Sequence, residues 1–405
     1  MRTLPSELRL DDLREARART LALVSDLSDA QFTVPMLEII NPILWEIGHV
    51  AYFAEYWTLR HLFGEPPIVP NADSLYDSAR IPHDTRWSLP LPDRAQTLEF
   101  MRTQLERTLA RADDAANMAH APYFYALALF HEDMHAEALV YTLQTLGYAW
   151  PFEPRVTLRA AEPVEALGDA HVPGGTYTIG STPEHGFVFD NEKWAHEVQV
   201  DAFDIARTPV TNAQFRAFID DGGYRTREFW SDEGWAWRTR ENAQQPIYWQ
   251  DDMRRHFNRL VALRDNEPVA HVNYFEAQAY CRWAGRRLPT EAEWEVAVTD
   301  APIRGNLDGA YGDVCDVSLF ADAQSRYGCR QMIGNVWEWT QSLFEPYPGF
   351  AADPYKEYSE PWFGTHYVLR GGAWSTRSRL ITTRWRNFYR PHRRDIITGF
   401  RTVRA

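Results

Sequence analysis

The sequence predicts an α+β protein in which a four-helix bundle precedes an irregular domain of short strands and helices. Three observations lead to this fold class. Apolar residues recur at three-and-four spacing from about Leu8 to Leu146, which is typical of amphipathic helices. The composition breaks from Ala149 to Pro163, where two short Pro-flanked stretches occur. Beyond this break, short apolar runs separated by Gly and Pro indicate strands and turns.

The elements follow in order along the chain. The four helices are expected in LREARARTLALVSDL, ILWEIGHVAYFAEYWTLRHLF, TLEFMRTQLERTLARADDA and FYALALFHEDMHAEALVYTLQTLG. The first loop, roughly Gly64 to Pro92, is rich in Pro, Asp and Arg, and its length suggests a binding role. In the second half, strands are expected in VPGGTYTIGS, HEVQVDAFDIARTPVT, GTHYVLRGGAW and TGFRTVRA, and helices in AQFRAFIDD and NYFEAQAYCRWAGRR. We therefore expect a bundle over residues 1–155 and a second domain over residues 165–405.

Bulk composition limits the class of function. With 42 basic and 56 acidic residues, the net charge of −14 disfavours nucleic-acid binding, although a local basic pocket is compatible with it. Three cysteines without framework spacing indicate a reducing compartment. No signal peptide and no apolar run of ~18 residues is present, so a cytoplasmic protein is expected, as a monomer or a dimer.

The segment FHEDMHAEAL, residues 130–139, contains a pair of histidines four residues apart. In a helix, His131 and His135 share one face with about 5–6 Å between their Cβ atoms, so one metal ion can bind both. A third ligand is expected from another helix, because bundles build metal sites from inward-pointing side chains on facing helices. His49, within ILWEIGHVAYF, is the best candidate.

Alternative interpretations remain at this point. As H-E-x-x-H the segment matches zinc peptidases, but that chemistry needs Glu132 as general base and a ligand after the pair, and the next histidine is His171, beyond the domain break. A buried histidine bonded to a carbonyl, with two surface histidines, is the non-functional alternative. Glu137 is expected to accept a hydrogen bond from an imidazole. Three neutral imidazoles suit zinc hydrolysis and iron(II) oxygen chemistry alike, and spacing does not choose between them.

Six motifs follow the helical region in order, namely VPGGTYTIGS, ARTPVTNAQFRAFI, RRLPTEAEWEVA, IGNVWEWT, VLRGGAW and GFRTVRA. Together with the histidine pattern they resemble the sulfoxide synthase family of ergothioneine biosynthesis over nearly the whole chain. This resemblance implies a DinB-like four-helix bundle fused to a C-type-lectin-like domain similar to the formylglycine-generating enzyme. The bundle segments NPILWEIGHVAYFAEYW, SLYDSARIPHDTRWSLPLP and ALFHEDMHAEA look most like the branch that makes selenoneine.

By this resemblance, His49, His131 and His135 bind iron(II) (Fe²⁺), and the enzyme uses dioxygen to join a chalcogen to C2 of the hercynine imidazole. The leading expectation is a carbon–selenium bond formed with a selenosugar. The alternatives are sulfur from cysteine, γ-glutamylcysteine or a thiosugar, or a catalytically silent module that binds a small cation.

The sequence departs from the family at expected substrate contacts. Met134 stands where the ergothioneine enzymes commonly carry a glutamine, and Phe388-Tyr389 stand where they supply a tryptophan and an aspartate. These departures are compatible with a seleno-sugar donor. With Asn387, the two rings are expected to contact the quaternary ammonium of hercynine. Arg86, in the long first loop, is expected to hold polar groups of the donor.

A catalytic tyrosine is expected in the late loop FEPYPGFAADPYKEYSE, and Tyr355 is chosen from its three tyrosines. The copper-binding cysteines of the formylglycine-generating enzymes have no counterpart, so the second domain is expected to bind substrate and not to act as a redox centre. Its remaining motif residues are expected to determine the fold, namely Asn335, Trp337, Trp339, Gly371 and Gly372.

Overall fold

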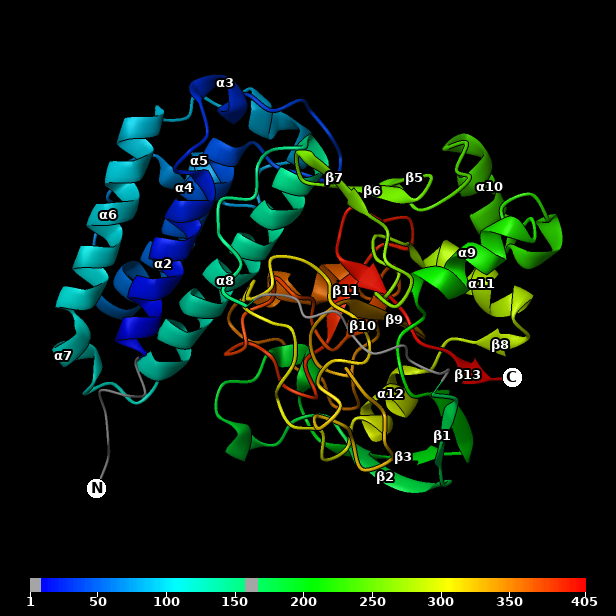
Figure 1. Ribbon diagram of the computed structural model, residues 1–405. Helices are drawn as coiled ribbons and strands as arrows, with labels where there is room; N and C mark the ends of the chain where they lie inside the picture. The colour runs from blue at the N-terminus through cyan, green and yellow to red at the C-terminus, as the bar shows by residue number, and fades with distance from the viewer. Residues whose placement is uncertain (1–8, 157–166) are drawn as a thin grey trace. The chain divides into compact units, whose positions relative to one another are not determined.

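The computed structural model describes residues 9–156 and 167–405, and the chain divides into two units, Met1–Pro151 and Phe152–Ala405. The described part of the first unit is helical, and the second mixes helices with short strands (Figure 1). The predicted α+β fold class is therefore confirmed.

Four long helices build the first unit: α2 (Leu10–Val24), α4 (Ile43–Glu55), α6 (Arg94–Ala110) and α8 (Ala121–Leu146). Its shorter elements are α3 (Asp29–Phe32), a π-helix η1 (Tyr56–His61), α5 (Ala72–Tyr76), a 3-10 helix η2 (His83–Trp87) and α7 (Ala112–Ala115). Helix α4 packs against α6 and α8, and α2 packs against α8 (Figure 1).

Helix α8 is the longest element and its boundaries have clear causes. It carries a proline in its first turn, where a missing N–H costs nothing, and it stops at Gly147, whose φ of 68° is left-handed. Because neighbouring helices cover several sides of α8, most of its residues are buried, including His131 and Glu132. The helix therefore presents polar side chains to the interior of the bundle.

The expected single helix over residues 43–63 is not regular. Helix α4 ends at Glu55, and the next turn is the π-helix η1. Within it, the Thr58 hydroxyl donates to the Ala54 carbonyl at 2.6 Å and also lies 2.8 Å from the Thr108 hydroxyl of α6. A side-chain hydroxyl that bonds an i−4 carbonyl can bend a helix locally, and this bond lies at the turn where the pattern changes.

The long first loop is ordered against the bundle. It contains α5 and η2, and both ends of η2 are tied to the segment before α4. The Trp87 indole N–H donates to the Val34 carbonyl at 3.0 Å, and His83 Nε2 bonds the Ile40 carbonyl at 2.6 Å. These bonds place η2, and Arg86 within it, beside the start of α4.

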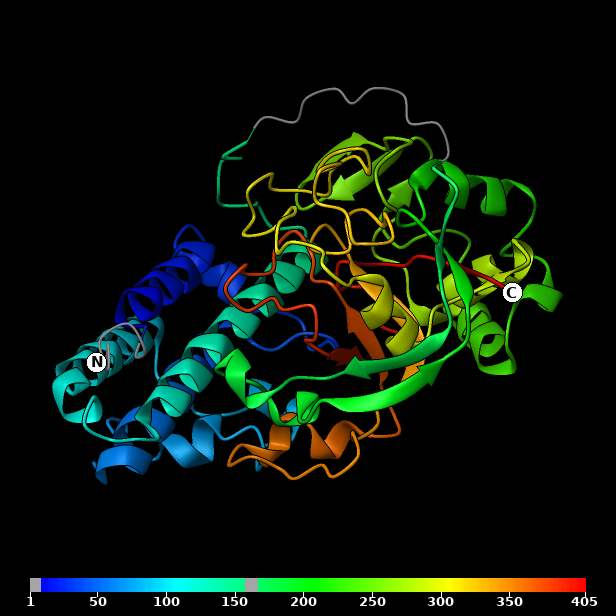
Figure 2. The same cartoon turned by 90° about the horizontal axis from the view of Figure 1, so that it is seen from below.

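The second unit contains four small sheets and four α-helices in its described part. Their orders are β1-β4-β13-β8, β11-β10-β9-β12, β2-β3 and β5-β6-β7, and β2 and β3 form a long twisted ribbon, green in Figure 2. The strands are β1 (Asp169–Val172), β2 (Gly175–Ile179), β3 (His196–Val200), β4 (Phe203–Ala206), β5 (Trp249–Gln250), β6 (Met253–His256), β7 (Arg259–Ala262), β8 (Arg286–Arg287), β9 (Trp337–Leu343), β10 (Tyr367–Arg370), β11 (Asn387–Tyr389), β12 (Thr398–Gly399) and β13 (Val403–Arg404).

The α-helices of this unit are α9 (Asn212–Asp220), α10 (Asp232–Arg240), α11 (Tyr274–Trp283) and α12 (Glu291–Ala297). Five 3-10 turns accompany them: η3 (Pro183–His185), η4 (Asp190–Glu192), η5 (Arg227–Phe229), η6 (Lys356–Tyr358) and η7 (Glu360–Trp362). Helices α9 and α11 are the two expected from the sequence, whereas α10 and α12 were not expected.

The residues expected to determine the second fold lie at its centre. Trp337 and Trp339 of β9 are fully buried. The Asn335 side chain bonds both the amide N–H and the carbonyl of Cys315, at 2.8 and 2.9 Å. Gly371 has a φ of 93°, and a Cβ there would lie 2.5 Å from the Met332 carbonyl oxygen, so only glycine fits.

All three cysteines are buried free thiols, so the expected absence of a disulfide framework agrees with the structure. In the described ranges, no helix combines the length and the apolar character that crossing a membrane would require.

Candidate metal centre

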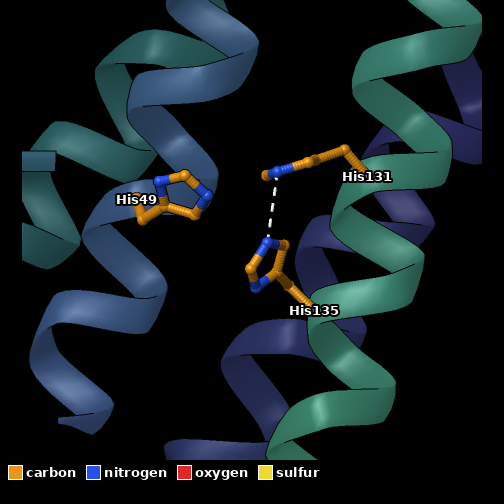
Figure 3. Close-up of side chains that lie close together, drawn as sticks. All are labelled: His49, His131 and His135. Carbon is orange, nitrogen blue, oxygen red and sulfur yellow. Dashed lines mark hydrogen bonds between the residues drawn. The ribbon is translucent and has the colours of Figure 1, made fainter. Parts of the chain in front are cut away.

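Three histidines meet in the interior of the first unit. His49 comes from α4, and His131 and His135 come from successive turns of α8. One ring nitrogen from each lies within 4.8 Å of those of the other two. Figure 3 shows the three rings converging on one space between the two helices. The structure thus brings together the three residues that the sequence selected as metal ligands.

Hydrogen bonds hold two of these rings from behind. His49 Nδ1 donates to the Tyr76 carbonyl at 2.7 Å, and His135 Nδ1 donates to Glu46 Oε1 at 2.5 Å. A carbonyl and a carboxylate only accept, so both rings carry their proton on Nδ1 and leave Nε2 as a lone-pair donor. The third ring, His131, stacks on Phe53 with centroids 3.5 Å apart.

The spacing of the two α8 nitrogens fits a shared metal ion. Nε2 of His131 and Nε2 of His135 lie 3.1 Å apart (Figure 3). Two imidazoles bound at about 2.0–2.1 Å to one ion, at angles from octahedral to tetrahedral, have nitrogens about 2.8–3.4 Å apart. The donor set is three imidazoles without a carboxylate, which leaves positions on an ion for substrate or dioxygen.

Electrostatics keep two rings of the cluster, those of His49 and His131, neutral. Burial lowers the pKa of His49 to about 3, and the positive charge of a protonated His135 acts in the same direction. Burial, followed by the other two histidines, also holds the pKa of His131 well below its ordinary value. Burial alone would raise the pKa of Glu46, but the charge and hydrogen bond of His135 outweigh it and lower that pKa. Neutral imidazoles beside an ionised carboxylate are what a divalent cation requires.

A carboxylate behind the cluster was not among the predicted residues. Glu137 Oε1 accepts from the Tyr141 hydroxyl one turn along α8, and its expected bond to an imidazole stays a prediction. The carboxylate bonded to a ring is Glu46 of α4, which the sequence reasoning missed. The available signal was W-E-x-x-H, in which an acidic residue precedes His49 by one helical turn.

Glu132 faces away from the histidines. Its carboxylate accepts from Arg17 of α2, with Arg17 Nε to Glu132 Oε1 at 2.8 Å and Nη2 to Oε2 at 3.2 Å. Both side chains are buried, and the same guanidinium donates to the Met101 carbonyl and to Gln104 of α6. A carboxylate held in this ion pair is not placed to act as a general base at the cluster, which opposes the peptidase interpretation.

Arg86 contacts the surroundings of the cluster. Its Nη1 donates to Asn41 Oδ1 at 2.6 Å, and its guanidinium carbon lies 3.9 Å from the centre of the Trp45 ring. Trp45 stacks in turn on His49, with centroids 4.7 Å apart and planes at 8°. Met134 is half-buried on α8, immediately before His135.

The other expected substrate residues lie in the second unit. Asn387, Phe388 and Tyr389 form β11. The Phe388 ring stacks on Phe344 at 4.0 Å, and the Arg393 guanidinium lies over the Tyr389 ring at 5.1 Å, so each ring already has a neighbour on it. Asn387 Oδ1 accepts from the Phe388 amide.

Tyr355, expected to be the catalytic tyrosine, lies in the late loop. Its ring centre is 6.2 Å from that of Tyr358. Tyr358 is itself stacked on Phe189 at 4.3 Å. The role of Tyr355 in chemistry stays a prediction.

Family models match both parts of the chain. The DinB superfamily matches residues 12–140, and the sulfatase-modifying factor enzyme 1-like domain matches residues 157–314 and 315–405. These regions correspond to the helical unit and to the mixed unit.

Full-length relatives share both regions. The chain is 36% identical to a hercynine oxygenase of Mycolicibacterium thermoresistibile, with 96% of this chain and 93% of the relative covered. It is 35% identical to the hercynine oxygenase of Mycobacterium tuberculosis, covering 96% of each. A formylglycine-generating enzyme of Streptomyces coelicolor is 32% identical over 53% of this chain and 81% of its own length. The chain belongs to the hercynine oxygenase family, with a DinB-superfamily bundle followed by a sulfatase-modifying factor domain.

Proposed function

We propose that this chain is an iron(II)- and dioxygen-dependent enzyme that joins a chalcogen atom to C2 of the hercynine imidazole. The observation that carries the proposal is the cluster of His49, His131 and His135, of which the first two are buried, in a chain related over its full length to hercynine oxygenases. Nitrogen ligands with open positions suit iron(II) as well as zinc, and the oxygenase relatives favour iron.

Within this proposal each histidine has a defined task. The bonds to Tyr76 and Glu46 direct the Nε2 atoms of His49 and His135 toward the ion, and the stack on Phe53 fixes the plane of His131. Iron(II), when bound there, supplies activation of dioxygen for oxidative bond formation. The surrounding apolar residues of α4 and α8 exclude water from the rings of His49 and His131.

The chalcogen that we propose is selenium, delivered by a selenosugar. Support comes from the departures at Met134 and at Phe388-Tyr389. In the ergothioneine enzymes the first position bonds the substrate imidazole, and the second segment supplies contacts to the ammonium group and the chalcogen donor. Met134, Asn387, Phe388 and Tyr389 remain the proposed contacts to hercynine and donor, and Tyr355 the proposed catalytic residue. Sulfur transfer from a thiol is the competing outcome of the test.

The test combines metal analysis with product analysis. The purified protein, loaded anaerobically with iron(II), should bind about one ion per chain, and each of His49→Ala, His131→Ala and His135→Ala should lose most of it. With hercynine, dioxygen and a selenosugar the loaded enzyme should form a carbon–selenium product, detected by mass spectrometry.

Parallel reactions with cysteine, γ-glutamylcysteine and a thiosugar compare the donors. A faster reaction with any thiol would replace selenium by sulfur. Unchanged iron content in His49→Ala would remove this residue from the ligand set, and no product with any donor would overturn the proposed function.

A further inference from the structure

Two separate contact paths lead from the histidine cluster to one arginine. Along the first, His135 Nδ1 bonds Glu46 Oε1, Asn41 Nδ2 donates to Glu46 Oε2 at 2.5 Å, and Arg86 Nη1 donates to Asn41 Oδ1 at 2.6 Å. Along the second, His49 stacks on Trp45, and Trp45 lies beneath the Arg86 guanidinium. Arg86 therefore reaches two of the three histidines, each through intermediate residues.

We propose that Arg86 is a positioning residue of the metal site, which holds His135 through Asn41 and Glu46 and holds His49 through Trp45. The inference rests on the proposed metal site and assigns Arg86 a task distinct from a contact with the chalcogen donor. In this role the guanidinium touches neither the ion nor a substrate.

The first path fixes the carboxylate that orients His135. Glu46 is buried, and its two oxygens are divided between His135 and Asn41. An amide that receives a bond from Arg86 on its oxygen is fixed in the orientation that donates its NH₂ to Glu46. Partners behind a ligand imidazole set its orientation and basicity, and their loss typically weakens metal binding about 10–100-fold.

The second path holds the plane of His49. Trp45 is buried and its indole N–H donates to the Leu75 carbonyl at 2.8 Å, so the indole cannot rotate freely. The Arg86 guanidinium and the His49 imidazole both pack on this indole, at 3.9 and 4.7 Å from its ring centre. Arginine can stack and donate hydrogen bonds at the same time because its group is planar, whereas a lysine ammonium cannot do both with this geometry.

The local fold supports the arginine. Arg86 lies in η2, and its neighbours His83 and Trp87 anchor that element to the Ile40 and Val34 carbonyls. A further bond, from Arg86 Nη2 to the Ile81 carbonyl at 3.4 Å, fixes the guanidinium from its own side of the loop. The ordered loop thus delivers one positive charge to the start of α4.

The experiment measures metal binding without substrate. Wild type, Arg86→Gln, Arg86→Lys and Asn41→Ala are titrated anaerobically with Co²⁺ as the probe, and affinity and the visible absorption bands of the bound ion are recorded. Arg86→Gln should bind Co²⁺ about 10–100-fold more weakly with altered bands, and Arg86→Lys should restore only part of the loss. The double variant Asn41→Ala/Arg86→Gln should lose less than the product of the two single losses, because both residues share one path.

Arg94→Gln is the matched control. Arg94 also places its guanidinium over a ring, that of Phe32 at 4.5 Å, and donates to the Leu27 carbonyl at 2.8 Å, but none of its described bonds leads to the histidines. Its loss should leave Co²⁺ affinity and bands unchanged. Thermal unfolding of each apoprotein identifies variants that have lost the fold. If Arg86→Gln has lost the fold, the Co²⁺ titration of Arg86→Lys takes its place.

The outcomes separate the two proposals. Wild-type Co²⁺ affinity and bands in Arg86→Gln, with only a raised KM for the chalcogen donor, would assign Arg86 to the donor and overturn the inference. A double variant whose loss of Co²⁺ affinity equals the product of the two single losses would also overturn the inference. A wild type that binds Co²⁺ but never acts on hercynine refutes the proposed function alone, and a wild type that binds no divalent ion refutes both.

Discussion

Two adjacent residues of α8 point to different sides of that helix. His131 points to the cluster, and Glu132, about 100° further round, points to Arg17 of α2. The H-E-x-x-H segment therefore carries a histidine pair that faces the cluster and a glutamate that forms a buried ion pair. The motif alone does not show whether its glutamate serves the cluster or an ion pair, because the residues are the same in both cases.

Glu132→Gln should reduce stability and leave the chemistry intact. Removing one charge of a buried ion pair costs about 3–5 kcal/mol. Because the new Gln amide oxygen still accepts one hydrogen bond from Arg17, the free energy of unfolding should fall by the lower value, about 3 kcal/mol. Urea unfolding measures this loss, and kcat/KM of the folded, iron-loaded variant should stay within about threefold of wild type. A fall of several orders of magnitude in fully folded protein would revive the hydrolase interpretation.

At the scale of elements, α4 and α5 constrain each other at Gly48. A Cβ on Gly48 would lie 2.3 Å from Cε1 of the Tyr76 ring. Tyr76 is fully buried, and its ring packs near Phe100 and Tyr52, with centroids at 6.2 and 6.4 Å. The ring therefore cannot move away cheaply, and the backbone of Tyr76 carries the carbonyl that holds His49.

Gly48→Ala should destabilise the protein although it replaces glycine inside a helix. Helix propensity alone would add about 1 kcal/mol of stability. The clash with Tyr76 should outweigh this gain, with a net loss of about 1–3 kcal/mol in urea unfolding and a weaker Co²⁺ affinity, because the Tyr76 carbonyl shifts. A more stable variant with unchanged affinity would show that the ring yields freely.

The sequence predicts an element well when the residues that determine it lie in the same segment, and poorly when they lie elsewhere in the chain. Helix α8 was predicted within three residues at each end, because its apolar pattern and Gly147 are local signals. Glu46 was missed because its partner is on another helix, and spacing within one helix does not report it. The π-turn after Glu55 lies in a segment whose apolar residues keep helical spacing, so periodicity does not report it.

Helix α12 shows the same limit in the second unit. Its three glutamates at alternate positions suggest an exposed segment, yet all are buried. They pair with arginines that lie elsewhere in the chain or outside the helix: Glu291 with Arg386, Glu293 with Arg287 and Glu295 with Arg370. Such pairing is a property of the tertiary fold, so periodicity could not predict it.

At the scale of the whole molecule, the proposed tasks are divided between the two units. The histidines belong to the first unit, and the aromatic strand β11 belongs to the second. Metal binding and recognition of the hercynine cation should therefore respond to different substitutions.

Discrimination between hercynine and histidine tests the second task. A quaternary ammonium loses its water cheaply and gains about 0.5–2 kcal/mol on each aromatic face, whereas a primary ammonium stays hydrated. With two or three rings engaged, wild type should prefer hercynine about 10–1,000-fold in kcat/KM. Phe388→Leu and Tyr389→Leu should each raise KM for hercynine and narrow this preference while leaving iron content unchanged.

The comparison is a steady-state assay of wild type and both variants with each amine, at saturating dioxygen and donor. Phe388→Leu also removes the stack on Phe344, so its folded fraction is measured first. Equal use of histidine by wild type would contradict the cation argument. If both variants kept the full preference for hercynine over histidine, the cation pocket would have to be formed by other residues.

The position of the ligands along the chain bears on how the protein is made. His49, His131, His135 and their supports all lie between Asn41 and His135, inside a unit with its own core. A ribosome adding about 5–20 residues per second needs roughly 10–50 s to add residues 147–405 after α8 has been made. The nascent bundle thus carries every proposed ligand before the second domain has been synthesised, which gives a divalent ion a period in which to enter.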